Sequence, residues 1–98
     1  MSKKMPPLHP GEVLREEFLV PFKMTANGLA KALNVPRSRI QRLSREKGRI
    51  ATDTALRLAR YFGTSTDFWQ HLQSDYDKGI VEQGIAKEIK AIKPIKAT

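Results

Sequence analysis

Apolar residues recur at helical spacing along most of this chain, and no stretch shows the apolar–polar alternation of a strand. Start and stop signals divide the pattern into five segments. Pro10 suits the first turn of the first helix, and Pro21 would end it. Gly63 suits the end of the fourth, which begins near Thr52, and Ser65 suits the cap of the fifth. We therefore expect an all-α protein with five helices.

The second and third segments lie close together in the sequence. Thr25 is a good N-cap for a helix over Ala26–Leu33. Asn34 follows, and asparagine tolerates the left-handed conformation that commonly ends a helix. The next helix is expected over residues 36–47. Two short helices joined by so short a turn are typical of a helix-turn-helix unit.

The third helix has two different faces. At about 100° per residue, Ile40 and Leu43 fall on one side with Pro36, and Arg39 borders that side. Arginine can pair bidentately with guanine, and glutamine with adenine, in the major groove, which admits an α-helix. The pattern therefore favours a surface that docks on DNA over a basic face that is merely solvated. The outward residues are Arg37, Ser38, Gln41, Arg42 and Arg45.

The preceding helix supports this interpretation. A helix-turn-helix needs a small residue inside its first helix and apolar residues that lock the two helices together. Ala30 is the small residue, and we predict a DNA-binding motif over about residues 26–47. The locking set is Leu29, Leu33, Val35, Ile40 and Leu43.

Charge and composition fit a DNA partner and argue against other classes. The formal net charge is +8, which favours a polyanion. The chain has no cysteine, so disulfides and cysteine-ligated zinc are excluded. His9 and His71 lack the spaced partners of a metal site, and His9 is instead expected to flank the first helix. We expect no enzyme activity, no metal, no cofactor and no small-molecule substrate.

The chain is expected to be cytoplasmic. Its first residues contain no apolar core of signal-peptide length, and no run approaches the roughly 18 apolar residues of a membrane span. At 98 residues it is a single domain, small enough to rely on a partner or a dimer interface for part of its stability. We divide it into a lead over residues 1–7, a folded domain over residues 8–83 and a basic tail over residues 84–98.

Three longer blocks are more specific: HPGEVLREEFLVPF, ALNVPRSRIQRL and TDTALRLARYFGTSTDFWQHLQSDYD. Together they resemble the HigA-type antitoxins, also called VapI-like, within the Xre or lambda-repressor-like helix-turn-helix class. The resemblance spans about residues 8–83. It implies a lambda-repressor-like five-helix fold, a homodimer and binding to double-stranded operator DNA. It also implies repression of the antitoxin's own operon and neutralisation of a HigB/RelE-like toxin that cleaves mRNA.

The resemblance further implies roles for individual residues. The family usually has glycine after the third helix, where this chain has Glu46. A glutamate there allows the helix to continue and leaves open the geometry of the contacts that follow it. The base-reading positions match Arg37, Ser38, Gln41 and Arg42, and the predicted phosphate contacts are Thr25, Arg39, Arg45, Lys47 and Arg49.

Residues beyond the fourth helix are candidates for a dimer interface. Phe68, Leu72 and Tyr76 have helical spacing, and Trp69 lies beside them on the helical wheel. Their spacing favours the core and a subunit contact over a ligand pocket. Tryptophan is also enriched at the energetic centres of interfaces.

The last residues are expected to form a flexible tail. Gly79 and Gly84 weaken the helical pattern that precedes it. Ile85, Ile89 and Ile92 nevertheless share one helical face among lysines. The alternative to a frayed end is a segment that becomes ordered on a toxin, a partner chain or DNA.

Two other functions fit the same residues. One is a stand-alone Xre-type transcriptional regulator that uses the same DNA surface and has no toxin partner. The other is an interaction module whose DNA surface no longer binds. The identity of the neighbouring gene separates the first from an antitoxin, and a binding assay with the upstream DNA separates the second.

Overall fold

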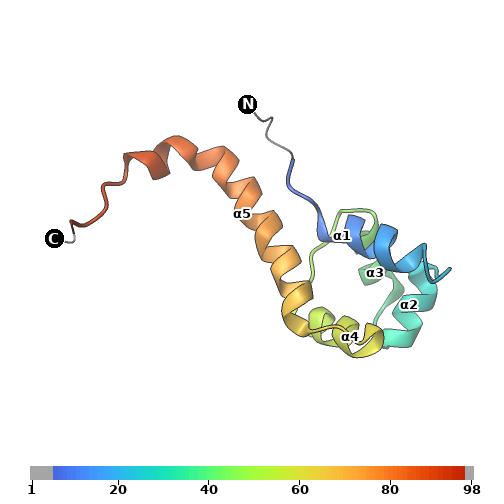
Figure 1. Ribbon diagram of the computed structural model, residues 1–98. Helices are drawn as coiled ribbons and strands as arrows, with labels where there is room; N and C mark the ends of the chain where they lie inside the picture. Colours follow the sequence, from blue (N-terminus) through green and yellow to red (C-terminus); the bar gives the residue numbers. More distant parts are fainter. Residues whose placement is uncertain (1–5, 97–98) are drawn as a thin grey trace.

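Helices account for the regular structure of the described chain (Figure 1). The structure, a computed structural model, describes residues 6–96, so residues 1–5 of the expected lead and 97–98 of the expected tail lie outside the described residues. The elements are α1 (Pro10–Val13), the π-helical η1 (Leu14–Leu19), α2 (Ala26–Leu33), α3 (Arg37–Ser44), α4 (Thr52–Phe62) and α5 (Thr66–Ala91). Over residues 6–96 no strand is present, and the prediction of an all-α fold with five helices is confirmed, with α1 and η1 together forming the first.

A single apolar core joins the helices. It receives at least one buried side chain from each of η1, α2, α3, α4 and α5. Burial of this kind contributes about 25 cal/mol per Å² of apolar surface removed from water, so these residues are the main source of stability. The largest apolar side chains in it that are fully buried are Leu14, Leu29, Ile40, Leu43, Leu58 and Trp69.

The two motif helices are locked as the sequence predicts. Ala30, the expected small residue, is buried in α2. Val35 lies half-buried in the turn and packs against the core. The other members of the predicted locking set are also buried, namely Leu29, Leu33, Ile40 and Leu43.

Local residues set the helix ends. The Thr25 Oγ1 accepts a hydrogen bond from the amide of Gly28 at 2.9 Å, and Ser65 caps α5 in the same way at 3.0 Å. Asn34, with φ 60°, and Gly63, with φ 73°, end α2 and α4 in the left-handed conformation. These four predictions are confirmed.

The first helix ends near the predicted position, but it changes from an α-helix to a π-helix along its length. It begins at Pro10, and the segment from Leu14 to Leu19 is π-helical. A π-helix bonds residue i to residue i+5, which brings side chains five apart toward one face. Leu14 and Leu19 are both buried, and Phe18 packs partly buried against the core.

The start of this helix is held by His9, which is buried. Its Nδ1 accepts a hydrogen bond from the amide of Gly11 at 2.8 Å. Its ring meets the ring of Tyr76 edge-on, with centroids 4.7 Å apart. The expected position of His9 beside the first helix is confirmed, and its role there is that of an N-cap.

The tail predicted from residue 84 begins in helical conformation, because α5 continues to Ala91 and projects away from the other helices (Figure 1), and its flexibility stays a prediction. Gly79 and Gly84 each disfavour a helix by only about 1 kcal/mol, too little to end it. The helix is interrupted at Ile85, whose φ is −125°. The side chains of residues 80–96 are exposed. Within the described residues, no helix combines the length and the apolarity that a membrane crossing requires.

Candidate DNA interface

The two faces predicted for α3 are present. Ile40 and Leu43 are 0% and 1% exposed and anchor the helix in the core. Arg37, Ser38 and Arg42 are exposed on the opposite side. Because the apolar side is fully used by the fold, the basic side is the one available to a partner.

α3 is shorter at both ends than the predicted 36–47. Pro36 precedes the helix and is exposed, so it does not belong to the apolar face. Arg45 is the C-cap residue, and Glu46 adopts a left-handed φ of 63°. The amides of Glu46 and Lys47 donate to carbonyls of the last turn of α3 at 2.9 Å each, which is a Schellman closure. The expectation that a glutamate lets the helix continue is therefore wrong.

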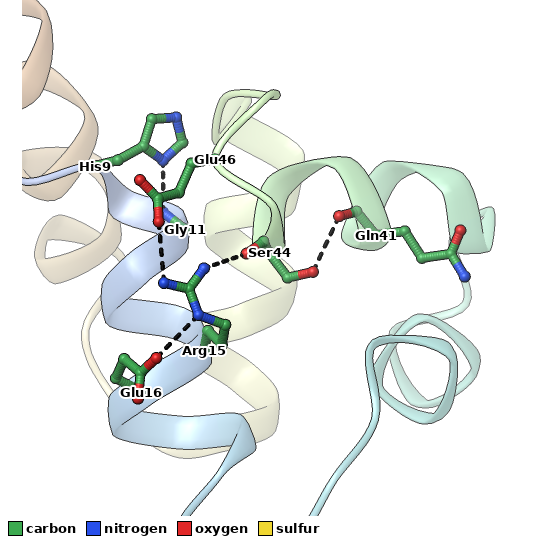
Figure 2. A network of polar contacts seen from close by, with 7 residues as sticks. All are labelled: His9, Gly11, Arg15, Glu16, Gln41, Ser44 and Glu46. Atoms are coloured by element: carbon green, nitrogen blue, oxygen red, sulfur yellow. Dashed lines mark hydrogen bonds and ion pairs between the residues drawn. The ribbon is translucent and has the colours of Figure 1, made fainter.

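Arg15 of η1 contacts the C-terminal end of α3 (Figure 2). Its guanidinium donates to the carbonyl of Ser44 and pairs with the carboxylate of Glu46 at 2.9 Å. Its Nε also donates to Glu16 at 3.0 Å. The Arg15 guanidinium thus gives a hydrogen-bond donor to a carbonyl at the end of α3 that has no partner within the helix. It also pairs with Glu46, at the position where the resemblance predicts glycine. The sequence did not predict this role of Arg15. The residue lies among acidic neighbours in the first helix, and nothing in that pattern indicates a contact with the end of α3.

Gln41 is tied to the first motif helix. Its Nε2 donates to the Oδ1 of Asn27, in the first turn of α2, at 2.7 Å. Gln41 is half-buried and Asn27 is exposed, so this bond lies at the rim of the surface. It restricts the orientation of the Gln41 amide. Asn27 was not among the predicted site residues, although its place one turn before Lys31 puts both on one face of α2.

A hollow of about 490 Å³ lies between α2 and α3 next to this bond. Lys31 and Arg37 are the cations at its edge. Thr25 is exposed at the N-terminus of α2, where the helix dipole favours an anion. The residues lining the hollow are Asn27, Gly28, Ala30, Lys31, Val35 and Arg37.

Arg39, a predicted phosphate contact, is turned toward α4. Its Nη1 donates to the Oδ2 of Asp53 at 2.7 Å, and Arg57 reaches the same oxygen at 3.2 Å. The hydrogen bond from Arg39, followed by that from Arg57, lowers the pKa of the Asp53 carboxyl below its usual value. In this structure Arg39 therefore links α3 to α4.

Arg49, another predicted phosphate contact, is paired with α5. Its two terminal nitrogens donate to the two carboxylate oxygens of Asp77 at 2.9 and 3.2 Å. The hydrogen bonds from Arg49 and then from Gln73 lower the pKa of the Asp77 carboxyl. Arg45 and Lys47 are exposed and form no ion pair within the described part of the chain. Of the four charged residues predicted to contact phosphate, Arg39 and Arg49 are thus paired with a carboxylate, whereas Arg45 and Lys47 are unpaired within the described residues.

The candidate dimer residues differ in their surroundings. Trp69 is 0% exposed, and its Nε1 donates to the Oγ1 of Thr64 at 2.7 Å, so its prediction as an interface residue is wrong. It fills the core of its own chain, packed against Phe18. Leu72 and Tyr76 are half-buried and Phe68 is exposed, and these three stay predictions.

The geometry on α2 and α3 is that of a helix-turn-helix, and comparisons with known proteins agree. The family model described as Helix-turn-helix matches residues 14–69. Virulence-associated protein I of Dichelobacter nodosus is 51% identical over 82 residues, which cover 84% of this chain and 76% of that protein. Antitoxin HigA-1 of Vibrio cholerae is 32% identical over 92 residues, which cover 94% of this chain and 87% of that one.

A solved structure extends the likeness to three dimensions. The Pseudomonas aeruginosa antitoxin HigA, solved with the higBA promoter, has a TM-score of 0.87 and 42% sequence identity. The match covers 92% of this chain and 99% of that one. The chain therefore belongs to the helix-turn-helix family, in the branch that contains HigA antitoxins and virulence-associated protein I.

Proposed function

We propose that this protein is a DNA-binding antitoxin that represses its own operon and neutralises a RelE-like toxin in the cytoplasm. The single observation that carries the DNA part is the position of Arg37, Ser38 and Arg42. They are exposed on a helix whose other face is fully buried. The likeness to an antitoxin solved with its promoter supports the proposal.

In the proposed complex α3 enters the major groove. Arg37 and Arg42 pair with guanine edges, and Ser38 contacts a base edge or a phosphate. Gln41 presents an amide whose orientation the bond from its Nε2 to Asn27 restricts, which reduces the number of bases it can read. Base contacts of this kind choose the site, while phosphate contacts fix the register of the helix.

Phosphate contacts come from the exposed groups around α3. We assign them to Arg45 and Lys47, which have no carboxylate partner within residues 6–96, and to Thr25 at the N-terminus of α2. Lys31, at the edge of the hollow between α2 and α3, joins them. Each neutralised phosphate contributes about 0.9 to the slope of log affinity against log salt.

The test is a fluorescence anisotropy titration of the upstream DNA of the gene. Arg42→Ala should weaken binding by about 1–3 kcal/mol and relax the preference at one base position. Arg60→Ala, which removes an exposed arginine from α4, is the matched control and should bind as the unchanged protein does. Failure of the unchanged protein to bind this DNA at low salt would leave the interaction module as the function.

A homodimer is proposed because DNA-binding proteins of this type read paired half-sites, about 34 Å apart for one helical turn. Phe68 is 38% exposed on α5 and, with Leu72 and Tyr76, supplies an apolar surface for it. Phe68→Glu should reduce the mass seen by light scattering from dimer to monomer. Leu56→Glu, at an exposed apolar site on α4, should leave the mass unchanged. An unchanged mass for Phe68→Glu would rule out this part of α5 as the interface.

The toxin partner is supported by the names of the relatives, which include antitoxin HigA-1. Co-expression with the adjacent gene tests it. The adjacent product should arrest growth alone, should be harmless with this protein and should co-purify with it. An adjacent product without toxicity would favour the stand-alone regulator.

A further inference from the structure

The loop between α3 and α4 is fastened to α5 by a chain of three side chains. The amide of Ile50 donates to the Oε1 of Gln73 at 2.7 Å, in a buried position. The Nε2 of Gln73 donates to the Oδ1 of Asp77 at 3.0 Å. Asp77 in turn accepts both hydrogen bonds from Arg49. A residue of α5 therefore binds the guanidinium of Arg49 in the loop that follows α3.

We propose that Asp77 withholds Arg49 from the DNA backbone, so that α5 sets how strongly this loop binds phosphate. The proposal rests on the proposed DNA-binding function and deepens it. Its ligand class is the phosphodiester, whether in the operator or in any other duplex. Asp77 is thus a residue that limits affinity, whereas the unpaired Arg45 and Lys47 contribute to it.

The first argument is geometric. An arginine binds a phosphate most strongly through two parallel N–H groups, the same fork that it offers to a carboxylate. Both terminal nitrogens of Arg49 are bonded to Asp77, at 2.9 and 3.2 Å. This end-on fork cannot serve both anions at once, so an end-on bidentate contact between Arg49 and a DNA phosphate requires the pair to open.

The second argument concerns which partner can move. Gln73 is buried and fixed by the Ile50 amide, and it holds the carboxylate of Asp77 in place. The Arg49 side chain is 66% exposed, so it can turn away without disturbing the core. An exposed ion pair contributes little to stability, so the block that Asp77 imposes on a phosphate contact amounts to only several-fold in affinity. The pair therefore acts as a partial block, and removing the Asp77 carboxylate lifts it.

The experiment compares five variants of the full chain: Asp77→Asn, Asp77→Ala, Arg49→Ala, the double variant Asp77→Asn/Arg49→Ala and Asp75→Asn. Asp75 is an exposed acid on the same helix and gives the same change in charge without a bond to Arg49. Binding is measured by anisotropy at several salt concentrations, with the upstream duplex and with an unrelated duplex. Unfolding midpoints are measured alongside, and Asp77→Ala is a second variant that also removes the carboxylate.

Asp77→Asn should bind both duplexes several-fold more tightly, and its salt slope should steepen by about 0.9, the value for one further phosphate. Arg49→Ala alone should change affinity less than twofold. The double variant should lose the gain of Asp77→Asn. Asp75→Asn should differ from the unchanged protein by less than twofold.

Two results would overturn the proposal. A gain that persists in the double variant would mean that the loss of a negative charge acts through the general field of the protein. Weaker binding with a shallower slope for Asp77→Asn would mean that Asp77 positions Arg49 for DNA. The unrelated duplex separates this test from the test of the proposed function. Even if the protein does not recognise its upstream DNA, binding to the unrelated duplex still measures the contact between Arg49 and phosphate.

Discussion

Gly11 lies so close to the carbonyl of Leu43 that a Cβ on residue 11 would overlap that oxygen. At this point the start of the first helix meets the last turn of α3 through backbone atoms. Two neighbouring contacts, from His9 to Gly11 and from Arg15 to the end of α3, fix the same junction (Figure 2). The placement of α3, the helix proposed to read bases, therefore depends on the first helix.

Gly11→Ala should destabilise the fold by about 1–3 kcal/mol or more, since the added methyl group would overlap a backbone carbonyl that cannot rotate away. Gly84→Ala is the control, because a Cβ there meets nothing within 4 Å and alanine favours a helix by about 1 kcal/mol. Urea unfolding followed by circular dichroism measures both. Equal stability of Gly11→Ala and the unchanged protein would contradict the close approach.

Glu46→Gly and Glu46→Ala should differ in stability by about 1 kcal/mol in favour of glycine, because the left-handed conformation is strained for a residue with a Cβ. Both variants lose the ion pair with Arg15, so the comparison isolates the backbone. That pair is partly exposed and is worth about 0–1 kcal/mol. Chemical denaturation of both variants provides the measurement, and identical midpoints would argue against the φ of 63°.

The Asp53 and Asp77 carboxyls should titrate below their free values, and Arg39→Ala and Arg49→Ala should raise the pKa of Asp53 and Asp77 respectively. Because folding lowers both pKa values, the stability they contribute is present above the unfolded pKa of about 3.9. It is lost as pH falls through the lower folded pKa. We therefore expect no effect of these two groups between pH 7 and about pH 5. Carboxyl carbon NMR titration reports each pKa directly, and unshifted values would show that the pairs do not form in solution.

Trp69→Phe should lower stability by about 1–3 kcal/mol through lost packing and the unpaired Thr64 hydroxyl, without changing the oligomeric mass. The chain has a single tryptophan, so its fluorescence should move to longer wavelength on unfolding and follow the transition in the unchanged protein. Light scattering gives the mass of the variant. If the Trp69→Phe dimer dissociated into monomers while the unfolding midpoint stayed unchanged, Trp69 would belong to the dimer interface.

Local signals in the sequence determined the helices, their caps and the two-faced character of α3. Thr25, Asn34, Gly63 and Ser65 act within one turn of the chain, and their conformational preferences survive in the fold because nothing distant opposes them. The periodicity of Ile40 and Leu43 likewise identified the buried face. The helix-turn-helix could be read from these features.

Tertiary structure decided which predicted contact residues are unpaired and where α3 ends. Glu46, which is left-handed, pairs with Arg15, 31 positions earlier, and Arg49 is paired because Asp77, 28 positions later, faces it. Helical spacing placed Trp69 beside Phe68, yet only packing buried one and exposed the other. Such outcomes depend on which elements contact each other in the fold. A contact between segments that are far apart in the sequence stabilises the structure without producing a periodic pattern in either segment.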